Sequence, residues 1–202
     1  MPLLQQKIER HGIALGVLIA IVISAGGLVE VVPLYLTARS MPAAEGIHPY
    51  TPLALAGRDV YVREGCYGCH SQMIRTLRSE TARYGAYSRA GESVYDRPFQ
   101  FGSKRTGPDL ARIGGRYTDE WHLQHLLDPR AVVPDSNMPA YAWLADQRVD
   151  PHEVERRMRA LQKLGDPYSA QDLQSVSAQV QGHSELEALI AYLQGLGVTA
   201  QH

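Results

Sequence analysis

Cys66-Tyr67-Gly68-Cys69-His70 is the segment around which the rest of this chain is organised, and it contains both cysteines of the 202-residue sequence. A C-x-x-C-H sequence is typical of a site at which a c-type haem is attached covalently. Two thiols at this spacing can add to the two vinyl groups of one porphyrin, and the histidine that follows then reaches the iron as an axial ligand. The sequence therefore predicts one covalently bound haem c, with thioether bonds from Cys66 and Cys69 and an axial bond from His70.

Three other uses of the cysteine pair are less well supported by the sequence. A thioredoxin-like dithiol needs a βαβ setting, and no alternating strand pattern surrounds Cys66. A closed structural zinc site needs four ligands, and no second Cys/His pair follows at a usable spacing. A disulfide across two intervening residues would form a strained loop. Haem attachment is the interpretation that the remaining motifs favour.

An apolar segment near the N-terminus predicts a membrane anchor. Residues 13–36 are apolar apart from Ser24 and Glu30, with Pro33 near the end. As a helix, about 24 residues extend roughly 36 Å, which is enough to cross a bilayer. The run is longer than the roughly 7–15 residues of a signal-peptide core, and no clean cleavage site follows it. We therefore interpret it as an uncleaved anchor in contact with membrane lipid.

Two features of the predicted anchor suggest that it docks into a larger membrane protein. Gly12, Gly16, Ala20 and Ser24 recur every four residues, a spacing that lets another transmembrane helix approach closely. Glu30 is an ionisable residue inside the span, and such residues normally face protein or a water-filled cavity. The alternatives are that small residues are simply common in membrane spans, and that the Glu30 carboxylate reaches the outer interface.

The orientation of the anchor follows from the haem motif more than from charge. Lys7 and Arg10 precede the span and Arg39 follows it, which gives only a weak preference for a cytoplasmic N-terminus. Haem is attached to thiols on the periplasmic side of the bacterial inner membrane. The expected localisation is a single-pass protein of that membrane with its haem domain in the periplasm.

The sequence divides into three parts. Residues 1–36 are predicted to form a cytoplasmic N-terminus and the anchor, and residues 37–53, with three prolines and a glycine, a linker. Residues 54–202 are predicted to form the haem domain. The net charge of −1 gives no electrostatic reason to expect nucleic acid as a partner.

The haem domain is predicted to be helical. A short helix over 56–64 delivers the haem cysteines at its end, and a last helix begins at Ser184. This last helix has an apolar face formed by Leu186, Leu189, Ile190 and Leu193. Two further helices are expected over 149–164 and 170–181; in the first of them, a solvated face is predicted to carry Arg156, Arg157 and Arg159. Two terminal helices, with the haem motif after the first, indicate a mainly α chain: one N-terminal transmembrane helix followed by a class I cytochrome c-like domain.

Methionine is a common second axial ligand of an electron-transfer haem, and it raises the potential. Met138 is the candidate, because it lies in a proline-containing loop far from His70 in sequence. Met73 follows His70 too closely to reach the opposite face of the porphyrin. The remaining methionines lie outside the domain or in a charged helix: Met1, Met41 and Met158.

Histidine is the other common axial ligand, and His122 and His125 are the competitors of Met138. Both lie in an expected helix, where they are interpreted as groups near the haem or on the surface. A histidine that binds a metal generally donates its other ring N–H to a carbonyl or carboxylate. The carbonyl of Pro108 is the candidate acceptor for His70, and Leu110 is a candidate for packing on the haem face.

Five segments are characteristic when they occur together: CYGCHSQMIR at 66–75, RYGAYS at 83–88, FGSKRTGPDL at 101–110, GGRY at 114–117 and SNMPAY at 136–141. They resemble the membrane-anchored monohaem cytochrome c subunit (subunit II, FixO/CcoO type) of cbb₃-type cytochrome c oxidases. The resemblance extends from the anchor, with Val29-Glu30-Val31-Val32-Pro33-Leu34, to about residue 144, and more loosely to the C-terminal helix. Residues 149–182 match no part of the family pattern that can be assigned.

The resemblance implies a haem–copper terminal oxidase that reduces oxygen to water and pumps protons. In it, this subunit would have no catalytic centre of its own. Its haem would relay electrons from a dihaem cytochrome c subunit or a soluble cytochrome c to the catalytic subunit, which carries b-type haem and copper. The alternatives are the monohaem subunit of nitric oxide reductase, a stand-alone membrane-anchored cytochrome c, and a haem-based enzyme or sensor with an open iron site.

Overall fold

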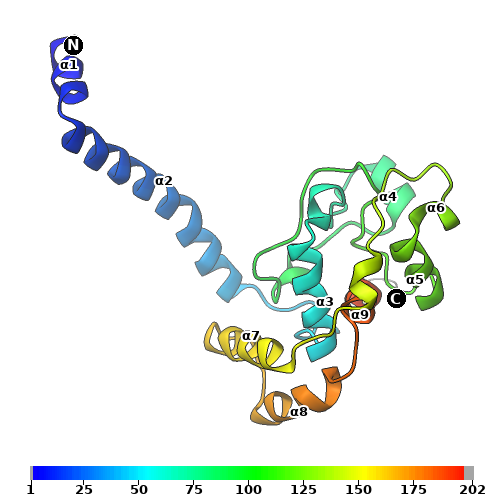
Figure 1. Ribbon diagram of the computed structural model, residues 1–202. Helices are drawn as coiled ribbons and strands as arrows, with labels where there is room; N and C mark the ends of the chain where they lie inside the picture. The colour runs from blue at the N-terminus through cyan, green and yellow to red at the C-terminus, as the bar shows by residue number, and fades with distance from the viewer. Residues whose placement is uncertain (1, 198–202) are drawn as a thin grey trace. The chain divides into compact units, whose positions relative to one another are not determined.

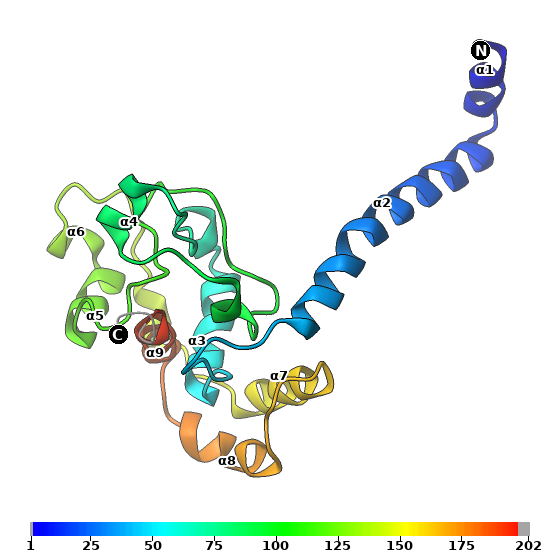
Figure 2. The same ribbon diagram turned by 180° about the vertical axis from the view of Figure 1, so that it is seen from behind.

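The computed structural model describes residues 2–197, without the side chains of residues 2–4 and 37–40. The chain divides into two compact units, one up to Pro42 and one from Ala43 onward (Figures 1 and 2). Within the described residues there is no β-strand, and the only β-pairing consists of the isolated bridges His70–Arg105 and Arg148–Ser184. The prediction of a mainly α chain is confirmed.

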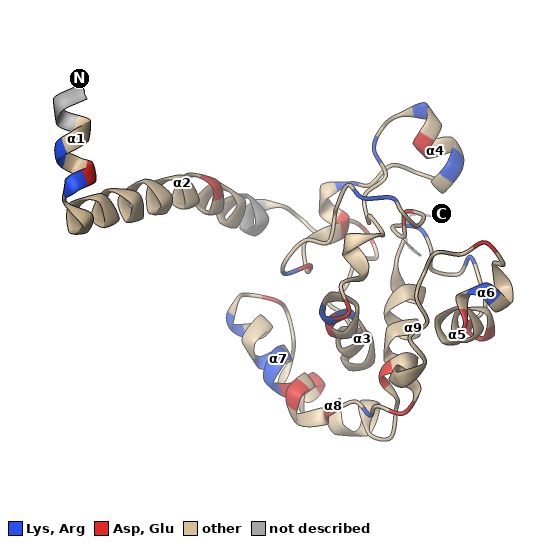
Figure 3. Cartoon of the chain, turned by 45° about the horizontal axis from the view of Figure 1, so that its top comes forward, with Lys and Arg blue, Asp and Glu red and all other residues tan. Residues whose placement is uncertain are grey.

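The N-terminal unit contains α1 (Pro2–Arg10) and α2 (Gly12–Ser40). Residues Gly12–Leu36 of α2 are a candidate membrane span, with a mean hydropathy of 2.5. Figure 3 shows that α2 is almost free of charged side chains. The single apolar helix is therefore confirmed, but α2 continues through Pro33 and beyond Leu36 to Ser40. Proline is tolerated in membrane helices because neighbouring groups satisfy the backbone that it frees.

The first helix of the second unit, α3 (Pro52–Arg63), begins four residues earlier than predicted. The hydroxyl of Thr51 accepts a hydrogen bond from the backbone N–H of Ala54 at 3.3 Å, which caps the helix. Pro52 occupies the first turn, where a missing N–H costs nothing. Pro52 lies in the linker predicted from the sequence, but it belongs to the helix. Tyr50, also in the predicted linker, packs against the core.

The last helix, α9 (Glu185–Gly195), begins where the sequence predicts. The Ser184 hydroxyl accepts from the N–H of Glu187 at 3.2 Å, and a Glu187 carboxylate oxygen accepts from the N–H of Ser184 at 2.7 Å. This reciprocal pair satisfies two backbone donors that the helix itself leaves free. All four residues of the predicted apolar face are buried, namely Leu186, Leu189, Ile190 and Leu193.

Helices α3 and α9 cross closely and form the frame of the domain (Figure 1). At the crossing lies Gly57, where a Cβ atom would stand 1.8 Å from the carbonyl oxygen of Ala188. Only glycine therefore allows the two backbones to approach this far. The core around the C-terminal half of α3 contains Val60, Tyr61, Ile113, Leu126, Leu144, Leu186, Leu189, Ile190, Tyr192, Leu193 and Leu196.

The helices α7 (Pro151–Lys163) and α8 (Ala170–Val180) form a second core against the N-terminal half of α3 (Figures 1 and 2). Both lie close to their predicted ranges. The buried residues of this cluster include Leu55, Ala56, Val154, Met158, Leu161, Leu173, Val176 and Val180. Arg156 and Arg159 are exposed and pair with acidic residues of their own helix, as a solvated face requires. Arg157 differs from the prediction, because it is half-buried and pairs with Asp59 of α3 at 3.3 Å.

Between α3 and α7 the chain is mostly loop with short helical turns. These elements are η1 (Cys66–Gly68), α4 (Arg78–Tyr84), η2 (Ala90–Ser93), α5 (Asp119–Leu127), α6 (Pro129–Val132) and η3 (Ala142–Ala145). Helix α5 packs against α9 and α6. The loops are thus anchored on the α3–α9 frame, and they contain every predicted haem-binding residue.

Replacing Gly57 by alanine is expected to destabilise the domain by about 3 kcal/mol or more, because the added methyl group collides with backbone that cannot rotate away. Gly195→Ala is the matched control, since a Cβ there meets nothing within 4 Å. Chemical unfolding of the full-length chain in detergent measures both variants. Equal stability of Gly57→Ala and Gly195→Ala would contradict the close crossing.

Candidate haem site

The predicted attachment motif forms one tight turn immediately after α3. Gly65 begins it with a φ of 71°, and the turn η1 follows. The N–H groups of Cys69 and His70 both donate to the carbonyl of Cys66, at 3.1 and 2.9 Å. Cys66 is half-buried and Cys69 is exposed, and both are free thiols. Burial raises the pKa of the Cys66 thiol to about 11.

The same region gives no support to the other uses of the cysteines. A βαβ dithiol site has no strands to form it within residues 2–197. Among the described residues no group of three or more His, Cys, Asp or Glu side chains could hold a metal ion, as a zinc site would require.

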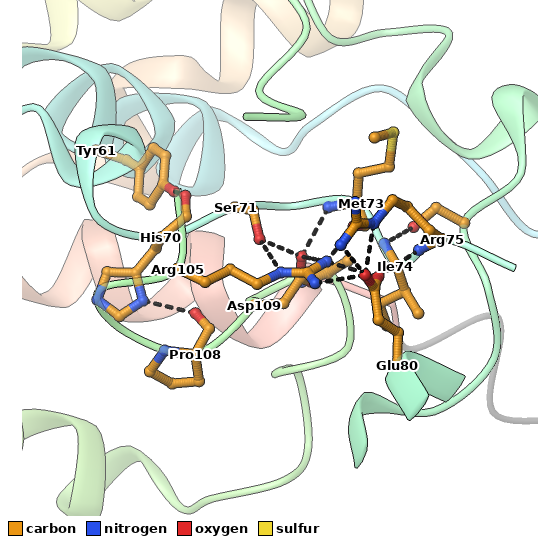
Figure 4. A network of polar contacts seen from close by, with 12 residues as sticks. Tyr61, His70, Ser71, Met73, Ile74, Arg75, Glu80, Arg105, Pro108 and Asp109 are labelled. Carbon is orange, nitrogen blue, oxygen red and sulfur yellow. Dashed lines mark hydrogen bonds and ion pairs between the residues drawn. The ribbon is translucent and has the colours of Figure 1, made fainter. Parts of the chain in front are cut away.

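The imidazole of His70 is held on two sides. Its Nδ1 lies 2.8 Å from the carbonyl oxygen of Pro108, the acceptor expected from the sequence (Figure 4). With the proton on Nδ1, this bond leaves Nε2 free to bind a metal. Gly107 lies close against the ring, because a Cβ there would stand 2.2 Å from Cε1 of His70. The hydroxyl of Tyr61 donates to the backbone carbonyl of His70 at 3.2 Å.

The sequence analysis missed Asp109, the residue directly after Pro108. Its buried carboxylate accepts hydrogen bonds from the hydroxyl of Ser71 at 2.6 Å and from the N–H groups of Met73 and Ala111 at 3.0 and 2.8 Å. Burial lowers the pKa of His70, and the Pro108 carbonyl and the Asp109 charge oppose that shift. The sequence signal that could have indicated Asp109 is its position in the Thr-Gly-Pro-Asp-Leu segment, directly after the predicted acceptor Pro108.

Met138 lies in the loop between α6 and η3. The side chain is half-buried and packs against the same core cluster as Cys66, Leu110 and Tyr141. The backbone N–H of Met138 donates to the hydroxyl of Ser136 at 3.2 Å, which braces the loop beside it. The tertiary structure therefore brings the candidate second ligand to the core that the attachment turn adjoins.

Two other methionines are directed elsewhere. Figure 4 shows the Met73 side chain pointing away from the ring of His70. Met158 is fully buried in the cluster of α7 and α8, which does not include the attachment turn. Because its side chain is buried in that other cluster, Met158 cannot be the second iron ligand. The charged residues around it in the sequence do not indicate this burial.

His122 and His125 lie on α5, and both present a buried ring nitrogen. Within the described residues, Nε2 of His122 and Nδ1 of His125 have no hydrogen-bond partner. His122 is only 3% exposed, which excludes a surface role. Burial lowers the pKa of both rings, and the charge of the nearby His70 lowers that of His125 further. The ring of His125 stacks on Trp121 with centroids 4.7 Å apart.

These observations fit a haem bound at this site. Two thiols and an imidazole with a free Nε2 lie on one turn, and a thioether packs against the adjoining core. Buried polar atoms without partners are costly, so the two orphaned histidine nitrogens require a partner such as a haem carboxylate or an ordered water. Gly107 leaves the imidazole the space that any side chain would fill.

Comparison with known proteins agrees with this geometry. No curated protein matches the chain. The family model described as cytochrome c oxidase, mono-heme subunit/FixO, matches residues 5–185, which include the anchor, the attachment turn and Met138. The chain therefore belongs to the FixO family of mono-haem cytochrome c oxidase subunits.

Proposed function

We propose that this chain relays electrons through one covalent haem c to the catalytic subunit of a haem–copper oxidase, where oxygen is reduced to water. The observation that supports the proposal is that, in a member of the FixO family, the turn with Cys66, Cys69 and His70 directly follows α3, and Cys66 and Met138 both pack against the α3–α9 core. The match to an oxidase subunit favours this function over that of a nitric oxide reductase subunit.

Each residue of the site has a separate task. Cys66 and Cys69 would hold the porphyrin through thioether bonds, and His70 and Met138 would be the axial ligands of the iron. The haem supplies a one-electron Fe(III)/Fe(II) couple, and methionine ligation raises its potential. Pro108 fixes the ring of His70, and Leu110 packs beside the site. With His70 and Met138 both bound to the iron, no position would remain for a substrate, so the chain would have no catalytic centre of its own.

The membrane unit would place this relay beside its partners. Helix α2 is proposed to cross the bacterial inner membrane once, with the haem domain in the periplasm. The acceptor would be the catalytic subunit with b-type haem and copper, which also pumps protons. The donor would be a dihaem cytochrome c subunit or a soluble cytochrome c. Glu30, the charged residue within the span Gly12–Leu36, is the residue that such a membrane partner would contact.

The native complex that contains this chain is expected to hold copper together with b-type and c-type haem. Gentle solubilisation, purification and elemental analysis, combined with haem spectra, measure this composition. Iron with b-type haem but no copper would instead indicate a nitric oxide reductase. A preparation with c-type haem alone would indicate a stand-alone carrier.

Cys66→Ala is expected to leave at most one thioether bond, because a single thiol can add to only one vinyl group. The α-band of the pyridine haemochrome then shifts, since one vinyl group stays conjugated with the ring. Tyr67→Phe is the matched control, as it changes the residue between the thiols without removing either. Two intact thioether bonds in Cys66→Ala would refute the attachment site.

Met138→Leu is expected to lower the midpoint potential and to open the iron to carbon monoxide, because it removes the axial thioether. Met73→Leu is the control, since its side chain points away from His70. Redox titration and carbon monoxide difference spectra of the full-length chain measure both effects. An unchanged spectrum in Met138→Leu would show that another residue, such as His125, is the second ligand.

A further inference from the structure

Two segments pair side by side at the proposed iron ligand. The histidine segment comprises residues 69–73, and the proline segment comprises residues 105–111. Two backbone hydrogen bonds join them, from Gly107 N–H to the Cys69 carbonyl at 3.1 Å and from Leu110 N–H to the Ser71 carbonyl at 2.8 Å. The contacts of His70 with Pro108 and of Ser71 with Asp109 lie between these bonds (Figure 4). The position of the imidazole thus depends on the proline segment.

Asp109 is the buried anion of this pairing. Its side chain is 0% exposed. Its two carboxylate oxygens accept four hydrogen bonds: two from the histidine segment, one from the N–H of Ala111 and a long one, at 3.5 Å, from Arg105. A buried charge is stable only when such donors replace water. The carboxylate therefore fixes the backbone on both sides of Pro108.

Arg105 is the matching cation. Its guanidinium donates to the Ser71 hydroxyl and to the Met73 carbonyl, each at 2.9 Å, and lies 3.5 Å from the Asp109 carboxylate. On its other side it pairs with Glu80 at 2.7 Å. Arg105 and then Arg75 hold the pKa of Glu80 well below its usual range. The network therefore joins the positive charge of Arg105 to the negative charges of Asp109 and Glu80.

We propose that Asp109 and Arg105 are positioning residues that orient His70 and, through their opposite charges, set the midpoint potential of the iron. This inference rests on the proposed function, because it requires haem iron on His70. A nearby negative charge stabilises the ferric iron more than the ferrous iron and lowers the potential, and a positive charge raises it. The Asp109 side chain is 0% exposed and that of Arg105 is 21% exposed, so both charges are screened less than fully exposed charges would be.

The order of the contacts explains why these two residues act on the ligand. Asp109 directly follows Pro108, whose carbonyl holds Nδ1 of His70. Arg105 forms an isolated β-bridge with His70 itself. Each charged residue is therefore connected to His70 through the backbone, in addition to the electrostatic effect of its charge. A network that served only stability would not require either connection.

The test is a redox titration of the full-length, haem-loaded chain in detergent. Asp109→Asn is expected to raise the midpoint potential, and Arg105→Gln to lower it. Arg105→Lys keeps the charge and is expected to shift the potential less than Arg105→Gln. Arg75→Gln is the matched control, because it removes the same charge from a side chain that is 57% exposed; its shift is expected to be smaller than that of Arg105→Gln.

Hyperfine-shifted NMR signals of the His70 ring and the Met138 methyl group provide the second readout, and both are expected to move in Asp109→Asn. Shifts of the same sign in Asp109→Asn and Arg105→Gln, or no shift in either, would overturn the inference while the haem and the proposed function stand. If Asp109→Asn fails to fold, the comparison of Arg105→Gln with Arg105→Lys decides. A wild-type chain without covalent haem would overturn the proposed function, and this inference with it.

Discussion

The close crossing of α3 and α9 at Gly57 is the contact on which the rest of the domain depends. Because a Cβ at this position would collide with the Ala188 carbonyl, the two helices meet backbone to backbone. The crossing fixes the direction of α3, and the attachment turn follows directly from its C-terminal end. The loop that carries Met138 packs against the core formed by the same pair. The proposed ligands therefore lie around one frame although they are far apart in sequence.

A second level of order holds the histidine in the loops. Loops offer little regular backbone pairing, so the imidazole needs other supports. The proline segment supplies them through the Pro108 carbonyl, the close contact of Gly107 and the buried Asp109 carboxylate. Since the hydrogen-bonded Nδ1 leaves Nε2 free, the same contacts that order the loop would also select Nε2 as the atom that binds the proposed iron.

The pair α7 and α8 extends this frame in a different way. It covers the N-terminal half of α3 with its own apolar cluster and turns a charged face to solvent. Met158 illustrates the difference between the two cores. It is as buried as any core residue, but it belongs to the cluster that is remote from the attachment turn. This region stabilises the helix that delivers the cysteines without contributing a ligand.

Much of this protein can be read from local sequence. The C-x-x-C-H motif, the apolar span and the period of α9 all depend on residues that are near neighbours in the chain, so their chemistry is visible without a fold. The predicted start of α3 was less accurate, because proline usually interrupts a helix but is well suited to its first turn, where Pro52 lies. The Ser184 capping pair, by contrast, is a local signal, and it placed the start of α9 correctly.

The remaining features required the folded chain, because they join residues that are distant in sequence. Which elements pack together decides the burial of His122 and Asp109 and the position of Met158 in a separate core. No local sequence pattern encodes this packing. Likewise, the bond from Arg105 to Glu80 joins a loop to α4 across 25 positions. The sequence thus supplied the reactive groups and the anchor, whereas long-range packing decided which charges surround the histidine.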